Sequence, residues 1–133
     1  MIVLDASAAI RLLLRMEPAA SELDARIRRS PESLHAPAVL DAEVLHVLRR
    51  GLLRGFLTES RCELAVQDFL GLRVVRYQLT ALLDRMWALR ANLSVFNASY
   101  IVLAEALGAT VLTTDARLGR ASGHGATVEV YPS

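Results

Sequence analysis

Short apolar runs alternate along the chain with longer stretches in which apolar residues recur at helical spacing. The short runs predict buried strands, and the longer periodic stretches predict amphipathic helices. The expected strands lie at residues 1–4, 33–36, 73–77, through Val111, and 127–131. Because strands separated by helices pair in parallel, the pattern predicts an α/β fold whose central, mostly parallel, twisted sheet is flanked by helices on both faces.

Capping residues mark where the expected helices begin and end. Ser7 suits the N-cap of the first short helix, Thr58 with Glu59 suits the start of another, and Gly108 suits a C-terminal cap. Proline at the first turn favours helices that begin after Pro18 and Pro37. The expected helices follow Ser7, run from Pro18 toward Pro31, and span about 38–53, 58–69, 80–90 and 95–107.

Length and composition indicate one domain comprising residues 1–133. Charged residues interrupt every apolar run before the ~18 residues that a membrane span requires, so no membrane segment is expected. The first residues form an expected strand and lack the basic flank and apolar core of a signal peptide, which favours a cytoplasmic protein. Cys62 is the single cysteine, so an intramolecular disulfide is excluded.

The net charge is +1, yet all fifteen basic residues are arginine and none is lysine. The absence of lysine excludes Schiff-base chemistry and lysine-dependent phosphate loops. Arginine forms planar, bidentate contacts with phosphate, although a solvated surface role is the simpler interpretation of each one taken alone. The arginines that could line an RNA path are Arg11, Arg15, Arg49, Arg50, Arg54, Arg117 and Arg120.

Acidic residues stand at the ends of two apolar strands. Asp5 follows residues 1–4, Asp115 follows 110–114, and Glu43 lies within an apolar helix. A single acid at such a position usually caps a helix or faces water. Several buried acids without a neighbouring lysine would repel one another unless cations bind, and Mg²⁺ or Mn²⁺ prefers such oxygen ligands. The pattern therefore favours a divalent-metal site that hydrolyses phosphodiesters.

Four motifs together resemble the PIN domain of the VapC toxin family, over essentially the whole chain. They are Met1–Ser7, Ala36-Pro37 followed by Asp41–Val44, Asn97–Tyr100 continuing to Leu103–Glu105, and Thr113–Leu118. The resemblance implies a PIN-like α/β fold and the toxin of a type II toxin–antitoxin pair. Such a toxin would be an Mg²⁺- or Mn²⁺-dependent endoribonuclease that cuts structured RNA (tRNA, rRNA or mRNA) and is neutralised by a cognate antitoxin.

The same resemblance implies which side chains form the catalytic and metal-binding centre. The centre would comprise Asp5, Glu43, Asn97 and Asp115. Ser7 and Thr113 would support these ligands or contact a phosphate through their hydroxyls. Position 97 departs from the family pattern, which has Asp there, and a neutral amide coordinates a cation without accepting a proton. An introduced substitution, a natural weakened variant and a site that works with three acids all remain open.

Partners and competing classes complete the prediction. Abundant apolar helix positions favour a homodimer, and the resemblance implies a groove for an amphipathic antitoxin helix. A catalytically silent module that binds RNA or antitoxin is the main alternative, because Asn97 would empty the metal site. A phosphoacceptor receiver domain is disfavoured, because the chain lacks adjacent acids after the first strand and a lysine after the last core strand.

Overall fold

The sheet has five strands in the order β3-β2-β1-β4-β5, and every neighbouring pair is parallel. The computed structural model describes residues 1–132, so Ser133 of the expected domain lies outside the described residues. The strands are β1 (Ile2–Leu4), β2 (Leu34–Pro37), β3 (Val74–Tyr77), β4 (Thr110–Thr113) and β5 (Thr127–Val130). The predicted α/β fold is confirmed, and its sheet is fully parallel among the described residues.

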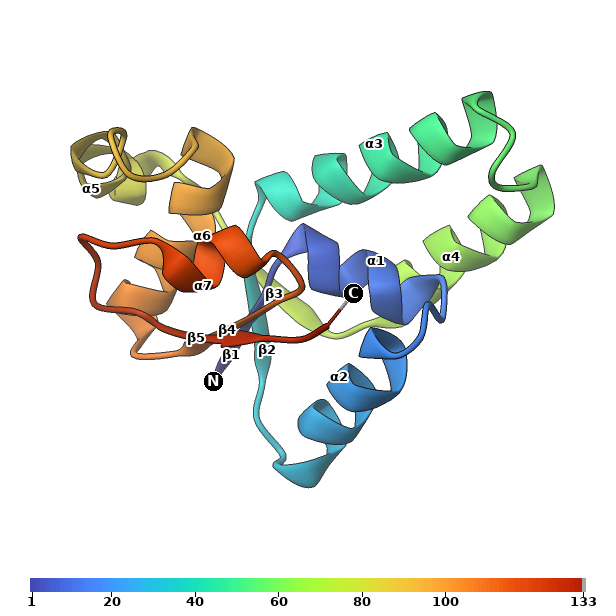
Figure 1. The fold of residues 1–133 in the computed structure, drawn as a ribbon, viewed down its shortest axis with the longest axis horizontal. Coiled ribbons are helices and arrows are strands. Elements are labelled where there is room, and N and C mark those ends of the chain that lie inside the picture. Colours follow the sequence, from blue (N-terminus) through green and yellow to red (C-terminus); the bar gives the residue numbers. More distant parts are fainter. Residues whose placement is uncertain (133) are drawn as a thin grey trace.

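Helices connect the strands and cover both faces of the sheet (Figure 1). They are α1 (Ala6–Leu13), α2 (Ala19–Arg29), α3 (Val39–Leu53), α4 (Glu59–Gly71), the 3₁₀ helix η1 (Thr80–Leu82), α5 (Leu83–Ala88), α6 (Val95–Leu107) and α7 (Ala116–Arg120). Helix α1 packs against α2, α3 and α4, whereas α6 packs against η1, α5 and strands β1, β2 and β4. None of the helices formed by residues 1–132 has the length and hydropathy needed to span a bilayer.

The centre of the core is formed by β1 and α6. All three residues of β1 are fully buried, and α6 buries seven successive residues, Ala98–Ala104. A helix that is buried on every side must be fixed in rotation as well as in position, because its apolar faces all have partners. Residues at the start of α6, including Asn97, are therefore held in a defined orientation at one edge of the sheet.

Several predicted caps are confirmed, and one is wrong. The Thr58 hydroxyl accepts a hydrogen bond from the Arg61 N–H at the start of α4. Gly108 ends α6 with φ 64°, a left-handed conformation that favours glycine. Ser7, however, lies inside α1, and the N-cap is Asp5, whose carboxylate accepts the Ala8 N–H at 2.9 Å. The acid at the end of β1 thus caps the helix as well as lining the site described below.

Three other segments differ from the sequence prediction. Pro37 ends β2 instead of opening α3, which begins at Val39. The expected helix over 80–90 is divided into η1 and α5, since the Leu82 N–H bonds to the Leu79 carbonyl three residues back. Helix α7 was not predicted, because five residues are too few to establish a helical period.

Arg26 joins three separate segments at the edge of the sheet opposite the site. Arg26 is 9% exposed, and its guanidinium donates to Glu32 and Glu129, each at 3.0 Å. Glu32 also accepts from the amino group of Met1 at 2.9 Å. The hydrogen bonds from Met1 and Arg26 lower the pKa of Glu32 to about 2. This network fixes α2 against the loop before β2 and against β5.

We expect Arg26→Gln to lower the thermal unfolding temperature by several degrees at pH 7, because Glu32 and Glu129 lose a cationic partner that is largely buried. A carboxylate whose pKa is lowered in the folded state contributes stability above its unfolded pKa and loses it as the pH falls. The difference between Arg26→Gln and the native chain should therefore narrow as the pH falls from about 4.5 to about 2. Thermal melts followed by circular dichroism across this pH range would measure it.

Arg28→Gln is the matched control, because Arg28 pairs with Asp24 while 78% of its side chain is exposed. Such a surface pair contributes roughly 0–1 kcal/mol, so this variant should melt close to the native chain at every pH. Equal melting temperatures for Arg26→Gln and the native chain would contradict a stabilising role of the network.

Candidate active site

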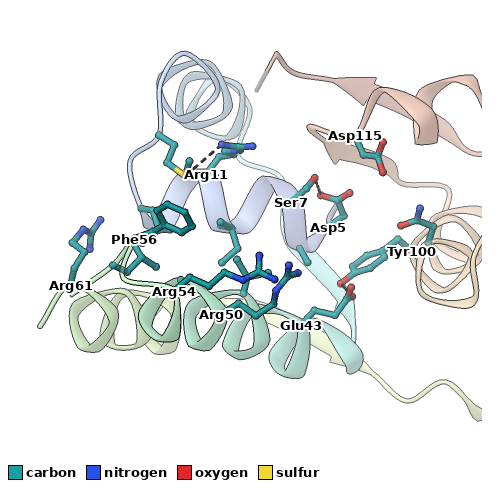
Figure 2. Close-up of a pocket in the computed structure, with 18 residues that line it drawn as sticks. Asp5, Ser7, Arg11, Glu43, Arg50, Arg54, Phe56, Arg61, Tyr100 and Asp115 are labelled. Atoms are coloured by element: carbon teal, nitrogen blue, oxygen red, sulfur yellow. Dashed lines mark hydrogen bonds between the residues drawn. The ribbon is translucent and has the colours of Figure 1, made fainter. Parts of the chain in front are cut away.

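A cleft of about 680 Å³ opens at the carboxyl edge of the sheet, and the predicted site residues converge on it (Figure 2). Because β1 and β4 are parallel neighbours, the residues that follow them meet at one edge. Five of the six predicted residues line this cleft: Asp5, Ser7, Glu43, Asn97 and Asp115. The sixth, Thr113, is fully buried at the end of β4 and hydrogen-bonded to Asp5.

Asp5 is the most deeply buried acid of the cleft, with 4% of its surface exposed. Its carboxylate accepts hydrogen bonds from the Ser7 hydroxyl at 2.7 Å, from the Ala8 N–H at 2.9 Å and from the Thr113 hydroxyl. Burial raises the pKa of Asp5 to about 6, although these three hydrogen bonds oppose the rise. A cation bound beside this carboxylate would favour its ionised form.

The hydroxyls of Ser7 and Thr113 also hold the loop after β4. Ser7 accepts the Thr114 N–H at 2.9 Å, and Thr113 accepts the Asp115 N–H at 3.0 Å. The two side chains therefore join the end of β1 to the end of β4, with Asp5 on one side and Asp115 on the other. The two hydroxyls therefore orient Asp5 and the start of the loop that carries Asp115.

Asp115 caps α7 and pairs with an exposed arginine. Its carboxylate accepts the Arg117 N–H at 2.9 Å and the Arg117 guanidinium at 3.3 Å. Desolvation raises the pKa of Asp115, but the hydrogen bonds from Arg117 outweigh it and the net shift is downward. Since the Arg117 side chain is 83% exposed, this pair is open to solvent and can exchange its partners.

Glu43 is held by a tyrosine from another helix. The buried Tyr100 hydroxyl donates to the Glu43 carboxylate at 2.6 Å across 57 residues of sequence. Burial and the adjacent Glu43 carboxylate raise the pKa of Tyr100 above its usual range, so the hydroxyl stays protonated. Tyr100 therefore sets the position of Glu43 in the cleft.

Asn97 occupies the first turn of α6 and faces the same cleft. Its backbone N–H donates to the Ser94 hydroxyl at 3.2 Å, which caps the helix and fixes the start of α6. The side chain is half-buried at the cleft wall. An aspartate at this position would present a fourth carboxylate to the space that Asp5, Glu43 and Asp115 share.

The donor set suits a hard divalent cation, because three carboxylates and an amide oxygen line one space. Burial raises the pKa of Asp5, and a cation bound beside it would stabilise the ionised carboxylate. Within residues 1–132, however, no three His, Cys, Asp or Glu side chains are gathered closely enough to hold one ion. Glu43 is turned to Tyr100 and Asp115 to Arg117, so coordination requires these side chains to be drawn inward.

The rest of the cleft is basic and apolar. Arg11 from α1, Arg50 from α3 and Arg54 at the C-cap of α3 line it, and Arg61 and Phe56 lie at its outer end, away from Asp115 (Figure 2). Of the arginines that the sequence suggested for an RNA path, Arg11, Arg50 and Arg54 line the cleft, whereas Arg15, Arg49, Arg117 and Arg120 do not. Arg61 and Phe56 were missed, because an exposed turn and the following helix carry no pattern that points them into a site.

Two acids that the sequence analysis left out of the site do lie outside it. Asp41, two residues from Glu43, pairs with Arg76 at 2.9 Å. Glu105 pairs with Arg85 at 3.0 Å and accepts the Gly125 N–H at 2.8 Å. Neither residue lines the cleft. Tyr100 was the missed positioning residue, and its spacing of three residues from Asn97, about one helical turn, is the signal that would have placed it nearby.

Sequence comparison identifies relatives over nearly the full chain. The PIN domain family model matches residues 2–123. Ribonuclease VapC12 of Mycobacterium tuberculosis is 38% identical over 130 residues, which cover 98% of each chain. VapC ribonuclease Mb0985 of Mycobacterium bovis is 42% identical over 118 residues, which cover 89% of this chain and 88% of the relative.

Solved structures share the fold at much lower identity. VapC20 of Mycobacterium tuberculosis, described as a toxin that cleaves the sarcin–ricin loop, superposes with a TM-score of 0.70 at 15% identity, covering 90% of this chain and 94% of its own. VapBC2 of Rickettsia felis, bound to a promoter DNA fragment, gives a TM-score of 0.72 at 13% identity, covering 98% and 99%. With the sequence relatives and the PIN-domain match, these findings show that the chain belongs to the VapC family of PIN-domain proteins.

Proposed function

We propose that this protein is the toxin of a type II toxin–antitoxin pair, an Mg²⁺- or Mn²⁺-dependent endoribonuclease that a cognate antitoxin neutralises. The observation that carries the proposal is the convergence of acids from three separate segments, after β1, within α3 and after β4, on one cleft beside Asn97. The names of the sequence relatives, which are VapC ribonucleases, support the choice of RNA as the substrate.

Asp5, Glu43, Asn97 and Asp115 would hold the cation, and Ser7 and Thr113 would keep Asp5 and Asp115 oriented toward it. When bound, the ion would supply an activated water and stabilise the leaving oxygen of the phosphodiester. Among residues 1–132, no lysine or histidine lines the acidic end of the cleft, so the ion would take the place of such a general base, with water as the nucleophile. Hydrolysis would then proceed without a covalent intermediate.

Position 97 decides how active this chain is. An asparagine oxygen can still coordinate a hard cation, but the centre loses one negative charge and a proton acceptor. We therefore propose that this chain is weakened or inactive while the rest of its site is intact. The contacts that position Asp5 and Glu43 do not involve the Asn97 side chain, which supports a local defect.

The partners proposed for this chain also come from its membership of the VapC family. We propose that residues 1–133 form one PIN domain that pairs as a homodimer in the cytoplasm, where its RNA substrate (tRNA, rRNA or mRNA) is found. The structural relative from Rickettsia felis is named as VapBC2 and not as VapC alone, which supports an antitoxin partner for this chain. Exposed apolar side chains on α3 and α4, among them Leu45, Leu53 and Leu70, offer surface for such contacts.

A catalytically silent binding module is the second candidate, and the observation that favours it is Asn97 itself. With three acids in place of four, the cleft would bind RNA or an antitoxin without cutting. The two candidates share a fold and a surface, so they differ only in hydrolysis and in metal affinity.

The substitution Asn97→Asp should create or increase ribonuclease activity, because it restores the fourth carboxylate of the centre. We expect cleavage of total RNA in Mg²⁺ or Mn²⁺ to rise by about tenfold or more, since even a group that only orients a metal ligand typically changes affinity or activity 10- to 100-fold. A chelator should abolish the activity. Gel analysis of RNA over time would measure both effects.

Gln67→Glu is the matched control, since Gln67 is exposed on α4 outside the cleft and the substitution also adds one negative charge. It should leave activity as it is in the native chain. If the native and Asn97→Asp chains cut RNA equally, three acids suffice for catalysis and the proposal that Asn97 weakens this chain is wrong. If neither cuts RNA, the binding module is the better proposal.

Tyr100→Phe should weaken Mn²⁺ binding by about tenfold, because loss of a group that orients a metal ligand typically costs 10- to 100-fold in affinity. The hydroxyl that holds Glu43 would be gone, while the buried ring would remain. Isothermal titration of Mn²⁺ into the Asn97→Asp chain, with and without Tyr100→Phe, would measure the change.

Tyr77→Phe provides the control, because Tyr77 also has a bonded hydroxyl, 2.7 Å from His35, but does not line the cleft. Its Mn²⁺ affinity should match that of the parent chain. Unchanged Mn²⁺ affinity of Tyr100→Phe would mean that the hydroxyl does not position Glu43. Tighter Mn²⁺ binding would mean that the hydroxyl competes with the cation for Glu43.

A further inference from the structure

One face of α3 carries a row of cleft residues whose chemistry changes along the helix. Glu43, Val47, Arg50 and Arg54 follow the i, i+4, i+7, i+11 spacing of a single helical face, and all four line the cleft. Arg50 and Arg54 lie roughly 10 and 16 Å along the axis from Glu43 at about 1.5 Å per residue. The acidic end of the cleft is therefore continued by a basic wall on the same rigid element.

The two arginines of this wall have no carboxylate partner. Five other arginines of the described chain pair with acids, among them Arg26, Arg76 and Arg85, whereas Arg49, the neighbour of Arg50, also has no acidic partner there. Among residues 1–132, none of the ion pairs or side-chain hydrogen bonds involves Arg50 or Arg54. Both side chains are exposed and extend between α1 and α3 toward the acidic end, as helical side chains tilt toward the N-terminus (Figure 2).

The outer end of the cleft adds an aromatic ring and a further cation. Phe56, in the turn after α3, is 82% exposed although it lines the cleft. This turn is fixed, because the Phe56 and Leu57 N–H groups both donate to the Gly51 carbonyl, at 2.9 and 3.1 Å. Arg61 donates to the Leu13 carbonyl through one nitrogen, while its buried Nη1 has no partner among the described residues.

We infer that this wall binds a single-stranded segment of RNA beside the bond to be cut, with Arg50 and Arg54 on successive phosphates and Phe56 against an unstacked base. The inference rests on the proposed ribonuclease function. The axial separation of the two arginines, about 6 Å, is comparable to the spacing of neighbouring phosphates along a strand. A duplex would keep its bases stacked and out of reach of Phe56.

Charge favours RNA over a protein as the occupant. Four arginines and three acids line the cleft, so its net charge is positive even before a cation binds. A divalent cation at the acidic end would make the net charge more positive, which suits a ligand with one negative charge per residue. Arginine recognises phosphate through paired N–H donors, and exposed aromatic rings stack on bases of any sequence.

The test measures binding of a short, fluorescein-labelled, single-stranded oligoribonucleotide of mixed sequence by anisotropy, in a chelator so that the RNA stays intact. Each phosphate contact by a cation contributes about 0.7 to the slope of log affinity against log salt for a single strand. Arg50→Gln and Arg54→Gln should each weaken binding several-fold and lower this slope by about 0.7, and the double variant should lower it by about 1.4.

Arg49→Gln is the matched control, because Arg49 is the exposed neighbour of Arg50 on α3 and does not line the cleft. It should leave the slope unchanged. Phe56→Ala should weaken binding about fivefold or more without altering the slope, since stacking releases no counterions. The same RNA sequence presented as a duplex should bind more weakly and should not respond to Phe56→Ala.

An equal loss for Arg49→Gln and Arg50→Gln would overturn the inference, because net charge alone would explain it. So would unchanged RNA binding by Arg50→Gln and Arg54→Gln together with weaker capture of the cognate antitoxin, which would make the wall a protein surface. Failure of the proposed function is separate. If Asn97→Asp does not cut RNA but the arginine variants still shift the salt slope, the binding wall stands without hydrolysis.

Discussion

The parallel pairing of β1 with β4 is the constraint on which the site depends. Neighbouring parallel strands must end at the same edge, so the loops that follow Leu4 and Thr113 are brought together. The hydrogen bond between the Thr113 hydroxyl and the Asp5 carboxylate then ties one strand end to the other. Crossover connections place α3 and α6 beside this edge, and their residues complete a cleft that no single segment could form.

The same constraint explains why the acids are buried to different degrees. Asp5 lies between the strand ends, where backbone and hydroxyl donors replace water, and this environment opposes its ionisation. Asp115 and Glu43 lie nearer the cleft opening, each with one protein partner. The cleft is therefore lined by one carboxylate held by several hydrogen bonds, Asp5, and by two with a single partner residue each, Glu43 and Asp115.

Much of this arrangement follows from local sequence signals. The strand positions of Asp5 and Asp115, the cap at Thr58 and the exit of α6 at Gly108 were predicted, because each depends on residues adjacent in the chain. Convergence of Glu43 and Asn97 came from the family resemblance. The contact of Tyr100 with Glu43 could not be derived, since it joins helices separated by 57 residues. Short segments such as α7 also escaped, because they lack a full hydrophobic period.

Glu43 and Arg50 belong to α3 and Arg54 is its C-cap, so α3 would set the distance between the proposed cleavage site and the proposed phosphate contacts. An α-helix is a stiff object, so this distance would not vary with the RNA that is bound. Helix α3 would then serve as a molecular ruler. Cleavage would fall at a constant offset from the gripped phosphates, and the uniform ends of the products would come from helical geometry instead of base recognition.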